Sequence, residues 1–179
     1  MDAQHILRFW FDELTPQQHF ARDLALDALM RERFGSVLEA GARGELWAWR
    51  ATTAGRLAEI VLLDQFSRNI HRDTPRAFAQ DPVALVLAQE LVATGRQAEL
   101  PQAQRRFVYM PYMHSESLTV HDQALRLFAE AGMEDNLRYE HQHRAIIERF
   151  GRYPHRNAVL GRVSTPDEQA FLSQPGSSF

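Results

Sequence analysis

The sequence predicts an all-α protein that forms a single domain over residues 1–179. Three observations predict this fold class. Apolar residues recur at the spacing of helix faces, and no segment alternates convincingly between apolar and polar residues as a half-buried strand would. Capping residues followed directly by proline, the order favoured at helix starts, occur at Thr15-Pro16, Asp81-Pro82 and Thr165-Pro166. A chain of 179 residues also buries roughly 70% of the surface that its unfolded state exposes, so it needs no disulfide or metal to fold.

The N-terminal half predicts three helices separated by loops. They are expected at 16–34, 53–69 and 82–93. Thr15 and Asp81 are the expected N-caps of the first and third helix, while Gly35 and Gly95 are the expected stops. Trp47 and Trp49 are expected in the glycine-containing loop between the first two helices.

The C-terminal half predicts four further helices. They are expected at 101–108, 115–131, 134–150 and in a short segment after Thr165. A break is expected at Met110-Pro111, because proline removes a backbone donor and clashes with the preceding turn. Glycine follows the second and third of these helices, and Thr165 with Glu168 forms a capping box.

The composition excludes several classes of protein. The chain contains no cysteine, which rules out a disulfide framework, a thiol nucleophile and a cysteine-ligated metal site. All twenty basic residues are arginine, so lysine Schiff-base chemistry and a P-loop are excluded too. The formal net charge of −3 gives nucleic acid and anionic lipid no general attraction, and no apolar run is long enough to span a bilayer. Without a basic and apolar leader at the N-terminus, we expect a cytoplasmic protein that binds neither nucleic acid nor membrane.

A first polar cluster lies on the helix expected at 53–69. This helix is apolar on nearly all sides, which predicts that it is buried. Asp64 and Arg68 lie four residues apart on its apolar stripe, so they should form a largely desolvated ion pair. One interpretation is a structural ion pair that ties the helix to its neighbours. The other is a polar pocket wall formed by Asp64, Gln65, Arg68 and Asn69.

A second cluster follows the expected break at Pro111, in the segment that begins with Tyr109. Ser115 is the expected N-cap of the next helix, which would place His114 and Glu116 at a helix N-terminus that favours anions. A histidine beside a glutamate suits a general base with its orienting carboxylate, or two metal ligands. The alternative is a capping loop in which Glu116 complements the helix dipole and His114 packs.

A third cluster follows the helix expected at 134–150. His143 lies on the apolar face of that helix, where a single histidine is usually a satisfied core residue. Four polar side chains then crowd into the loop after Gly151: Arg152, His155, Arg156 and Asn157. Planar arginine donors in this density predict a clamp for phosphate or carboxylate. The alternative is a loop tied to helix C-termini by arginine–carbonyl bonds.

Four separated motifs resemble those of the bacterial domain of unknown function 924 family. They are Phe9-Trp10-Phe11, Leu63-Asp64-Gln65-Phe66-Ser67-Arg68-Asn69, Tyr109-Met110-Pro111 with His114-Ser115-Glu116, and Phe150-Gly151-Arg152-Tyr153-Pro154-His155-Arg156-Asn157. The motifs occur in order and span nearly the whole chain. Ser67 and Tyr153 depart from the proline and phenylalanine that are frequent in relatives. The resemblance implies stacked antiparallel helices with a tetratricopeptide-like fold, and it implies no reaction because the family has no established activity.

The preferred functional hypothesis is a polar cleft that binds a small anionic ligand. Its ligand-binding residues would be Asp64, Gln65, Arg68, Asn69, Tyr109, Arg152, His155, Arg156 and Asn157. If the cleft is catalytic, His114 or His143 would be the acid or base and Glu116 or Asp64 its orienter. This requires the three clusters to converge. The signatures of zinc proteases, serine hydrolases and dinucleotide-binding proteins are missing, so we expect no cofactor and no metal.

Two other hypotheses remain open. The chain would be a protein-interaction module if a concave helical surface presented aromatic anchors, for which Trp10, Phe11, Trp47 and Trp49 are the candidates. Buried tryptophans would oppose that hypothesis. In the third hypothesis the polar motifs are internal cross-links of a helical protein, and substitution of Arg156 would destabilise the fold.

Overall fold

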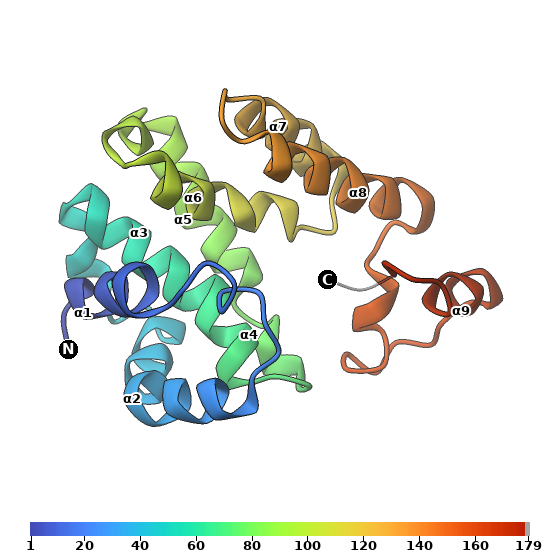
Figure 1. Ribbon diagram of the computed structural model, residues 1–179, viewed down its shortest axis with the longest axis horizontal. Helices are drawn as coiled ribbons and strands as arrows, with labels where there is room; N and C mark the ends of the chain where they lie inside the picture. Colours follow the sequence, from blue (N-terminus) through green and yellow to red (C-terminus); the bar gives the residue numbers. More distant parts are fainter. Residues whose placement is uncertain (178–179) are drawn as a thin grey trace. The chain divides into compact units, whose positions relative to one another are not determined.

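The computed structural model describes residues 1–177, and the regular elements in that range are all helical (Figure 1). The α-helices are α1 (Ala3–Arg8), α2 (Leu24–Ala42), α3 (Thr53–Val61), α4 (Ser67–Ile70), α5 (Asp81–Ala93), α6 (Gln102–Met113), α7 (Leu118–Phe128), α8 (Glu134–Phe150) and α9 (Pro166–Leu172). π-Helical turns occupy Phe9–Glu13 and Leu62–Phe66, and 3-10 segments occupy Trp47–Ala51, Pro75–Ala77, Arg96–Glu99 and Pro154–Arg156. The predicted all-α fold class is confirmed.

The chain divides into two compact units. Unit 1 comprises Met1–Arg72 and Arg76–Pro111, and unit 2 comprises Asp73–Pro75 and Tyr112–Phe179. The single domain expected from the sequence, and the tetratricopeptide-like stacking implied by the resemblance, stay predictions. Within residues 1–177 no helix is both long and apolar enough to cross a membrane.

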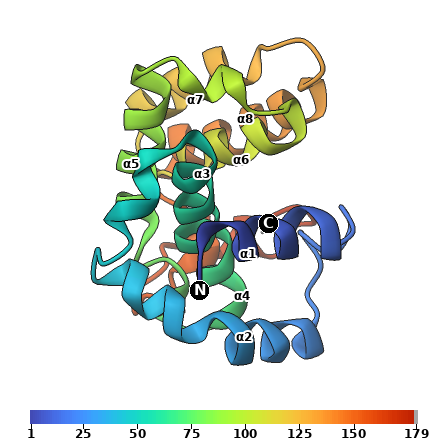
Figure 2. The same ribbon diagram turned by 90° about the vertical axis from the view of Figure 1, so that its left-hand side faces the viewer.

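The core of unit 1 forms around the helix expected at 53–69, which is confirmed. It consists of α3, the π-helical turn and α4 in direct succession, and it carries fully buried side chains such as Leu57, Ile60 and Leu63. Helices α1 and α5 pack on α3, and α2 packs on α4 (Figure 2). Because neighbours cover it from several directions, this helix is apolar nearly all round.

The first long helix begins and ends later than the sequence predicts. Thr15 and Gln18 form reciprocal side-chain to backbone bonds, but they close only a turn. Asp23 is the true N-cap of α2, because its carboxylate accepts from two amides of the first turn. Gly35 does not stop α2, since the buried stripe of the helix continues through Val37 and Leu38.

Three other helix boundaries differ from the prediction. Pro111 lies inside α6 and does not break it; the helix loses the one bond that the Pro111 nitrogen would donate and continues to Met113. Helix α7 begins at Leu118, so Ser115 is not its N-cap and His114 and Glu116 lie in a loop. Helix α5 starts one residue early, with Asp81 in its first turn rather than at the cap.

Unit 2 is built from the helices α7, α8 and α9. A short connection reverses the chain between α7 and α8, which pack side by side (Figure 1). Ile146, Ile147 and Tyr153 form a buried core against which Phe150 and Phe171 pack. The predicted end of α8 at Gly151 and the capping box of Thr165 with Glu168 are both confirmed.

Candidate functional site

A polar network in unit 2 surrounds the loop that follows α8. Gly151 ends α8 at φ 70°, a left-handed conformation that favours glycine and turns the chain inward. Tyr153 is fully buried, and its amide donates to Glu116 Oε1 over 2.7 Å. Arg162 donates to both oxygens of the same carboxylate, at 2.7 and 2.9 Å. Burial opposes ionisation of Glu116, but these donors outweigh it and lower the pKa of the carboxyl. Glu116 therefore anchors the loop, and its role as the orienter of a histidine stays a prediction.

A second carboxylate holds the other side of this loop. Arg152 donates to both oxygens of Glu168, at 2.7 and 2.9 Å, and to the carbonyl of Val163. Asn157 Nδ2 donates to Glu168 Oε2 over 3.2 Å, and Asn157 Oδ1 accepts from Arg162. The bonds from Arg152, with smaller contributions from the Thr165 amide and Asn157, lower the pKa of Glu168 to about 2. Two residues of the predicted anion clamp thus already bind a carboxylate of the chain.

The ion pair of Glu168 predicts a loss of stability in acid. A depressed pKa adds stability above the unfolded value of 4.5, and that stability is lost as the pH falls towards about 2. We expect Glu168→Gln to cost about 2 kcal/mol at pH 6, the size of a charge-assisted bond. The urea midpoints of both proteins at pH 6 and pH 3 test this, and the difference should shrink at pH 3. A constant difference between the two pH values would contradict the assignment.

A buried glutamate–histidine pair lies between α7 and α8. His121 and Glu140 are both fully buried, and Nδ1 lies 2.6 Å from Oε1. His121 Nε2 lies 2.9 Å from the Ser115 carbonyl oxygen and 3.2 Å from the Tyr153 hydroxyl. A carbonyl only accepts, so Nε2 carries a proton. Burial raises the pKa of Glu140, and the bond to His121 partly offsets this. The pair therefore holds two protons, and Nε2 acts as a donor rather than as a base.

The remaining predicted residues of unit 2 gather around the Tyr153 ring. The ring centroids of His143 and His155 lie 5.8 and 5.5 Å from that of Tyr153, and the Arg156 guanidinium lies 4.6 Å above it. Arg156 also donates to the carbonyl of His114 over 3.0 Å. The structure thus brings together the members of the second and third predicted clusters that belong to unit 2, whereas Tyr109 belongs to unit 1.

His143 is neutral in this environment. Burial lowers its pKa to about 3, and the nearby histidines act in the same direction against the bond to Tyr139. His143 Nδ1 lies 2.8 Å from the Tyr139 carbonyl and so carries the ring proton, which leaves Nε2 unprotonated. Among residues 1–177 no group of three or more histidine and acidic side chains is arranged to hold a metal ion.

The first predicted cluster lies in unit 1, and its buried ion pair is confirmed. Arg68 Nη1 lies 3.0 Å from Asp64 Oδ1, and the guanidinium also makes two 3.0 Å bonds to Asp81. Gln65 donates to the other oxygen of Asp64. Asn69 belongs to a separate network, in which it donates to Asp27. Convergence of this cluster with the polar network of unit 2 stays a prediction.

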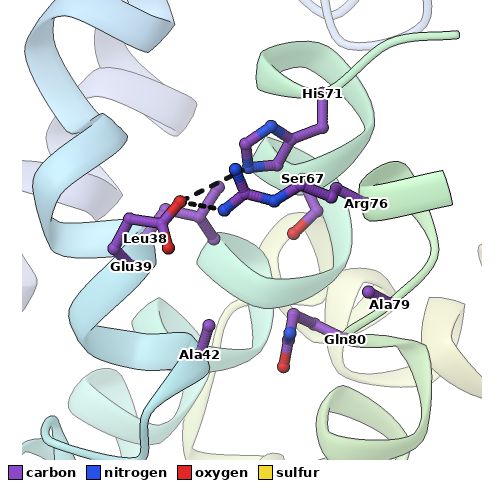
Figure 3. Close-up of a pocket in the computed structure, with 8 residues that line it drawn as sticks. All are labelled: Leu38, Glu39, Ala42, Ser67, His71, Arg76, Ala79 and Gln80. Carbon is purple, nitrogen blue, oxygen red and sulfur yellow. Dashed lines mark hydrogen bonds and ion pairs between the residues drawn. The ribbon is translucent and has the colours of Figure 1, made fainter. Parts of the chain in front are cut away.

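A small hollow in unit 1 is too small for a metabolite (Figure 3). Arg76 and His71 both point towards Glu39, with His71 Nε2 3.9 Å from its carboxylate. The hollow offers about 20 Å³, room for about one water molecule. It carries no ligand site.

A larger hollow opens on the surface of unit 2, between the end of α8 and the start of α9. It measures about 430 Å³, within the range of small-molecule sites. Its lining consists of Arg149, Phe150, Arg152, Thr165, Asp167 and Glu168. Arg152 is the one residue of the predicted site in this lining. Arg149 stands in the same polar stretch of sequence, in the last turn of α8, but was not among the predicted ligand-binding residues.

Comparisons with known proteins agree with the resemblance seen in the motifs. A family model described as a bacterial protein of unknown function (DUF924) matches residues 6–176. A solved structure, of the protein of unknown function ATU0120 from Agrobacterium tumefaciens, is 37% identical, covers 96% of both chains and superposes with a TM-score of 0.90. No curated protein matches. The match over nearly the full length shows that this chain belongs to the DUF924 family of bacterial proteins.

Proposed function

We propose that this protein binds a small anionic ligand in the surface hollow of unit 2. The proposal rests on one observation. A hollow of metabolite size is lined by guanidinium N–H groups, of Arg149 and Arg152, that make no hydrogen bond within the described part of the chain. Arg149 lies over the Phe150 ring at 4.6 Å and makes no ion pair within residues 1–177. Guanidinium groups match carboxylate and phosphate oxygens in geometry as well as in charge.

The neighbouring Arg152 contributes a fixed donor. Its Nε and Nη2 are bound to Glu168 and Val163, while Nη1 has no bond to the described part of the chain. The bidentate pair with Glu168 holds this guanidinium in place, so a ligand would pay little of the entropy of ordering it. Phe150 supplies an apolar wall, and its ring packs on Phe171 at 5.1 Å.

The charges in the hollow limit the ligand. Arg152 and Glu168 neutralise one another, which leaves the cation of Arg149 and the carboxylate of Asp167. A small anion fits Arg149, whereas a polyanion would be repelled by the acidic side of the hollow. Catalysis is not part of the proposal, because the glutamate–histidine pair of unit 2 is fully buried.

Substitution of Arg149 tests the proposal. A titration of the protein with inorganic phosphate and with succinate, followed by two-dimensional NMR, should shift amide signals of Phe150 and Arg152. We expect Arg149→Gln to weaken binding by about tenfold, the loss of one charge-assisted bond. Arg126→Gln is the matched control, because Arg126 is an exposed arginine in the last turn of α7. Equal affinities of the Arg149 variant and the original protein for both anions would overturn the proposal.

A second candidate function is the docking of a protein partner. Trp47 is 70% exposed, and exposed tryptophan is typical of interaction hot spots. Trp10, however, is 1% exposed, so its side chain is not available to contact a protein partner. A pull-down that loses its partner with Trp47→Ala would favour this candidate over ligand binding.

A further inference from the structure

We propose a separate binding site in unit 1, which takes a small aromatic carboxylate that also carries a hydroxyl or N–H group. The site is the aromatic cluster formed by Trp10, Phe11, His19 and Phe107, with Arg106 as its cation. It shares no residue with the hollow of unit 2, so a test of one site does not decide the other.

The first observation is a half-buried cation without an anion. Arg106 lies on α6, with its guanidinium 5.1 Å from the centre of the Phe107 ring. It makes no ion pair or hydrogen bond within residues 1–177, and its Nε is buried without a partner. Burial lowers the pKa of Arg106, in line with that environment. Uncompensated burial of charge is costly, and a bound carboxylate would relieve the cost.

The second observation is a pair of buried polar atoms beside this cation. Trp10 is 1% exposed and His19 is 8% exposed, and neither Trp10 Nε1 nor His19 Nδ1 has a hydrogen-bond partner in the described part of the chain. Buried polar groups are nearly always satisfied, so two orphaned atoms on stacked rings call for an explanation. The rings of Trp10 and His19 stack at 4.5 Å, which places both atoms in one cluster.

The protonation of His19 determines what each atom can bind. His19 Nε2 lies 2.7 Å from the carbonyl oxygen of Trp10 and therefore carries the ring proton. Burial lowers the pKa of His19, and the charge of Arg106 adds to the effect, so the ring is neutral at pH 7. Nδ1 is then an acceptor for a hydroxyl or N–H group. Trp10 Nε1 and Arg106 are donors, and they suit the oxygens of a carboxylate.

The charge of the cluster favours a carboxylate over a phosphate. Arg106 supplies its single positive charge, because His19 is neutral and the indole is uncharged. One guanidinium balances a monoanion, whereas a phosphate ester would carry a second charge without a partner. The neighbouring Arg105 is engaged elsewhere, since it donates to the Leu100 carbonyl over 3.1 Å.

The rings of the cluster favour an aromatic body. Phe107 meets Trp10 and His19 edge to face, at 5.7 and 5.4 Å, and Phe11 packs on Phe107 at 5.4 Å. Phe20 lies 6.1 Å from His19 and is 62% exposed, so it leaves a free aromatic face at the border of the cluster. Offset and edge-to-face packing with an added ring stabilises such an arrangement.

Three probes test the proposal on the full chain. The probes are 4-hydroxyphenylacetate, phenylacetate and phenylacetamide, each titrated while the indole N–H signal of Trp10 is followed by NMR. We expect 4-hydroxyphenylacetate to bind most tightly, phenylacetate less tightly and the uncharged amide at least tenfold more weakly. Equal binding of acid and amide, or an unmoved Trp10 signal, would overturn the site.

Variants separate the roles of the two polar side chains. Arg106→Gln should weaken both acids at least tenfold without lowering the melting temperature, because it removes a cation that has no partner. His19→Phe should abolish the advantage of the hydroxylated acid over phenylacetate. Arg8→Gln, an exposed arginine of α1, is the matched control and should leave all three affinities unchanged. Retention of binding in Arg106→Gln would refute the proposal, and Arg149→Gln should have no effect on these probes.

Discussion

Replacement of His121 by alanine is expected to lower the free energy of unfolding by about 3–5 kcal/mol, the cost of breaking a buried ion pair. The substitution leaves Glu140 fully buried without its bond over 2.6 Å. It also removes the donor to the Ser115 carbonyl and to the Tyr153 hydroxyl. Urea unfolding followed by circular dichroism measures the effect.

Two controls make this result specific. His141→Ala replaces an exposed histidine of α8 and should change stability by less than about 0.5 kcal/mol. Glu140→Gln should cost much less than His121→Ala, because its amide can donate to Nδ1 while Nε2 keeps its proton. If Glu140→Gln proved as damaging as His121→Ala, the pair would not hold the two protons inferred here.

Replacement of Asp27 by alanine is expected to cost a similar 3–5 kcal/mol. Asp27 is 3% exposed and accepts three bonds: one from Asn69 at 2.9 Å and two from Arg72 at 2.5 and 2.9 Å. Its loss removes the carboxylate that accepts from the buried amide of Asn69 and from the Arg72 guanidinium. The shift of the thermal midpoint reports the loss.

An exposed pair with similar geometry provides the comparison. Glu45 accepts two bonds from Arg43 at 2.7 and 2.8 Å, but the two side chains are 53% and 59% exposed. Solvent screens such a pair, so Glu45→Ala should lower the stability far less than Asp27→Ala does. Asp27→Asn should fall between the two, because it keeps the acceptor oxygen and removes the charge. Equal costs for Glu45→Ala and Asp27→Ala would show that burial of Asp27 contributes nothing.

The sequence predicted helices reliably where one strong signal acted alone. The helix that contains Asp64 was found because apolar residues on all its sides leave few alternatives to a buried helix. The start of α2 was missed because both Thr15 and Asp23 are good capping residues, and local propensity cannot rank them. Pro111 misled the prediction because a proline removes a single backbone bond, which the packing of a helix can outweigh, and α6 continues past it to Met113.

In the polar network of unit 2, the sequence indicated donor side chains but not their partners. The arginines of the loop after α8 donate to carboxylates that lie far along the chain: Glu168 is 16 residues from Arg152, and Glu116 is 46 from Arg162. No local periodicity encodes such distances. Arg106 was missed because a sequence does not show whether a cation has a partner in the folded chain.

The buried glutamate–histidine pair could have been found from the sequence. His121 shares one face of α7 with Ala124 and Phe128, at spacings of three and seven residues. Glu140 shares a face of α8 with Ile147 in the same way. When two adjacent helices each carry a polar residue on an apolar face, the two polar residues are expected to bind each other. Burial of either one without a hydrogen-bond partner would cost free energy.

The long separation between Glu116 and its partners has a consequence for synthesis of the chain. Unit 1 consists of Met1–Arg72 and Arg76–Pro111, so both partners of an ion pair within it have been made once residue 111 has been added. In unit 2, by contrast, Glu116 leaves the ribosome well before Arg162, and the network is complete only once Glu168 has been made. At 5–20 residues per second this takes roughly 3–10 s. During that time the Glu116 carboxylate is hydrated, and the nascent segment after it is open to chaperones and proteases.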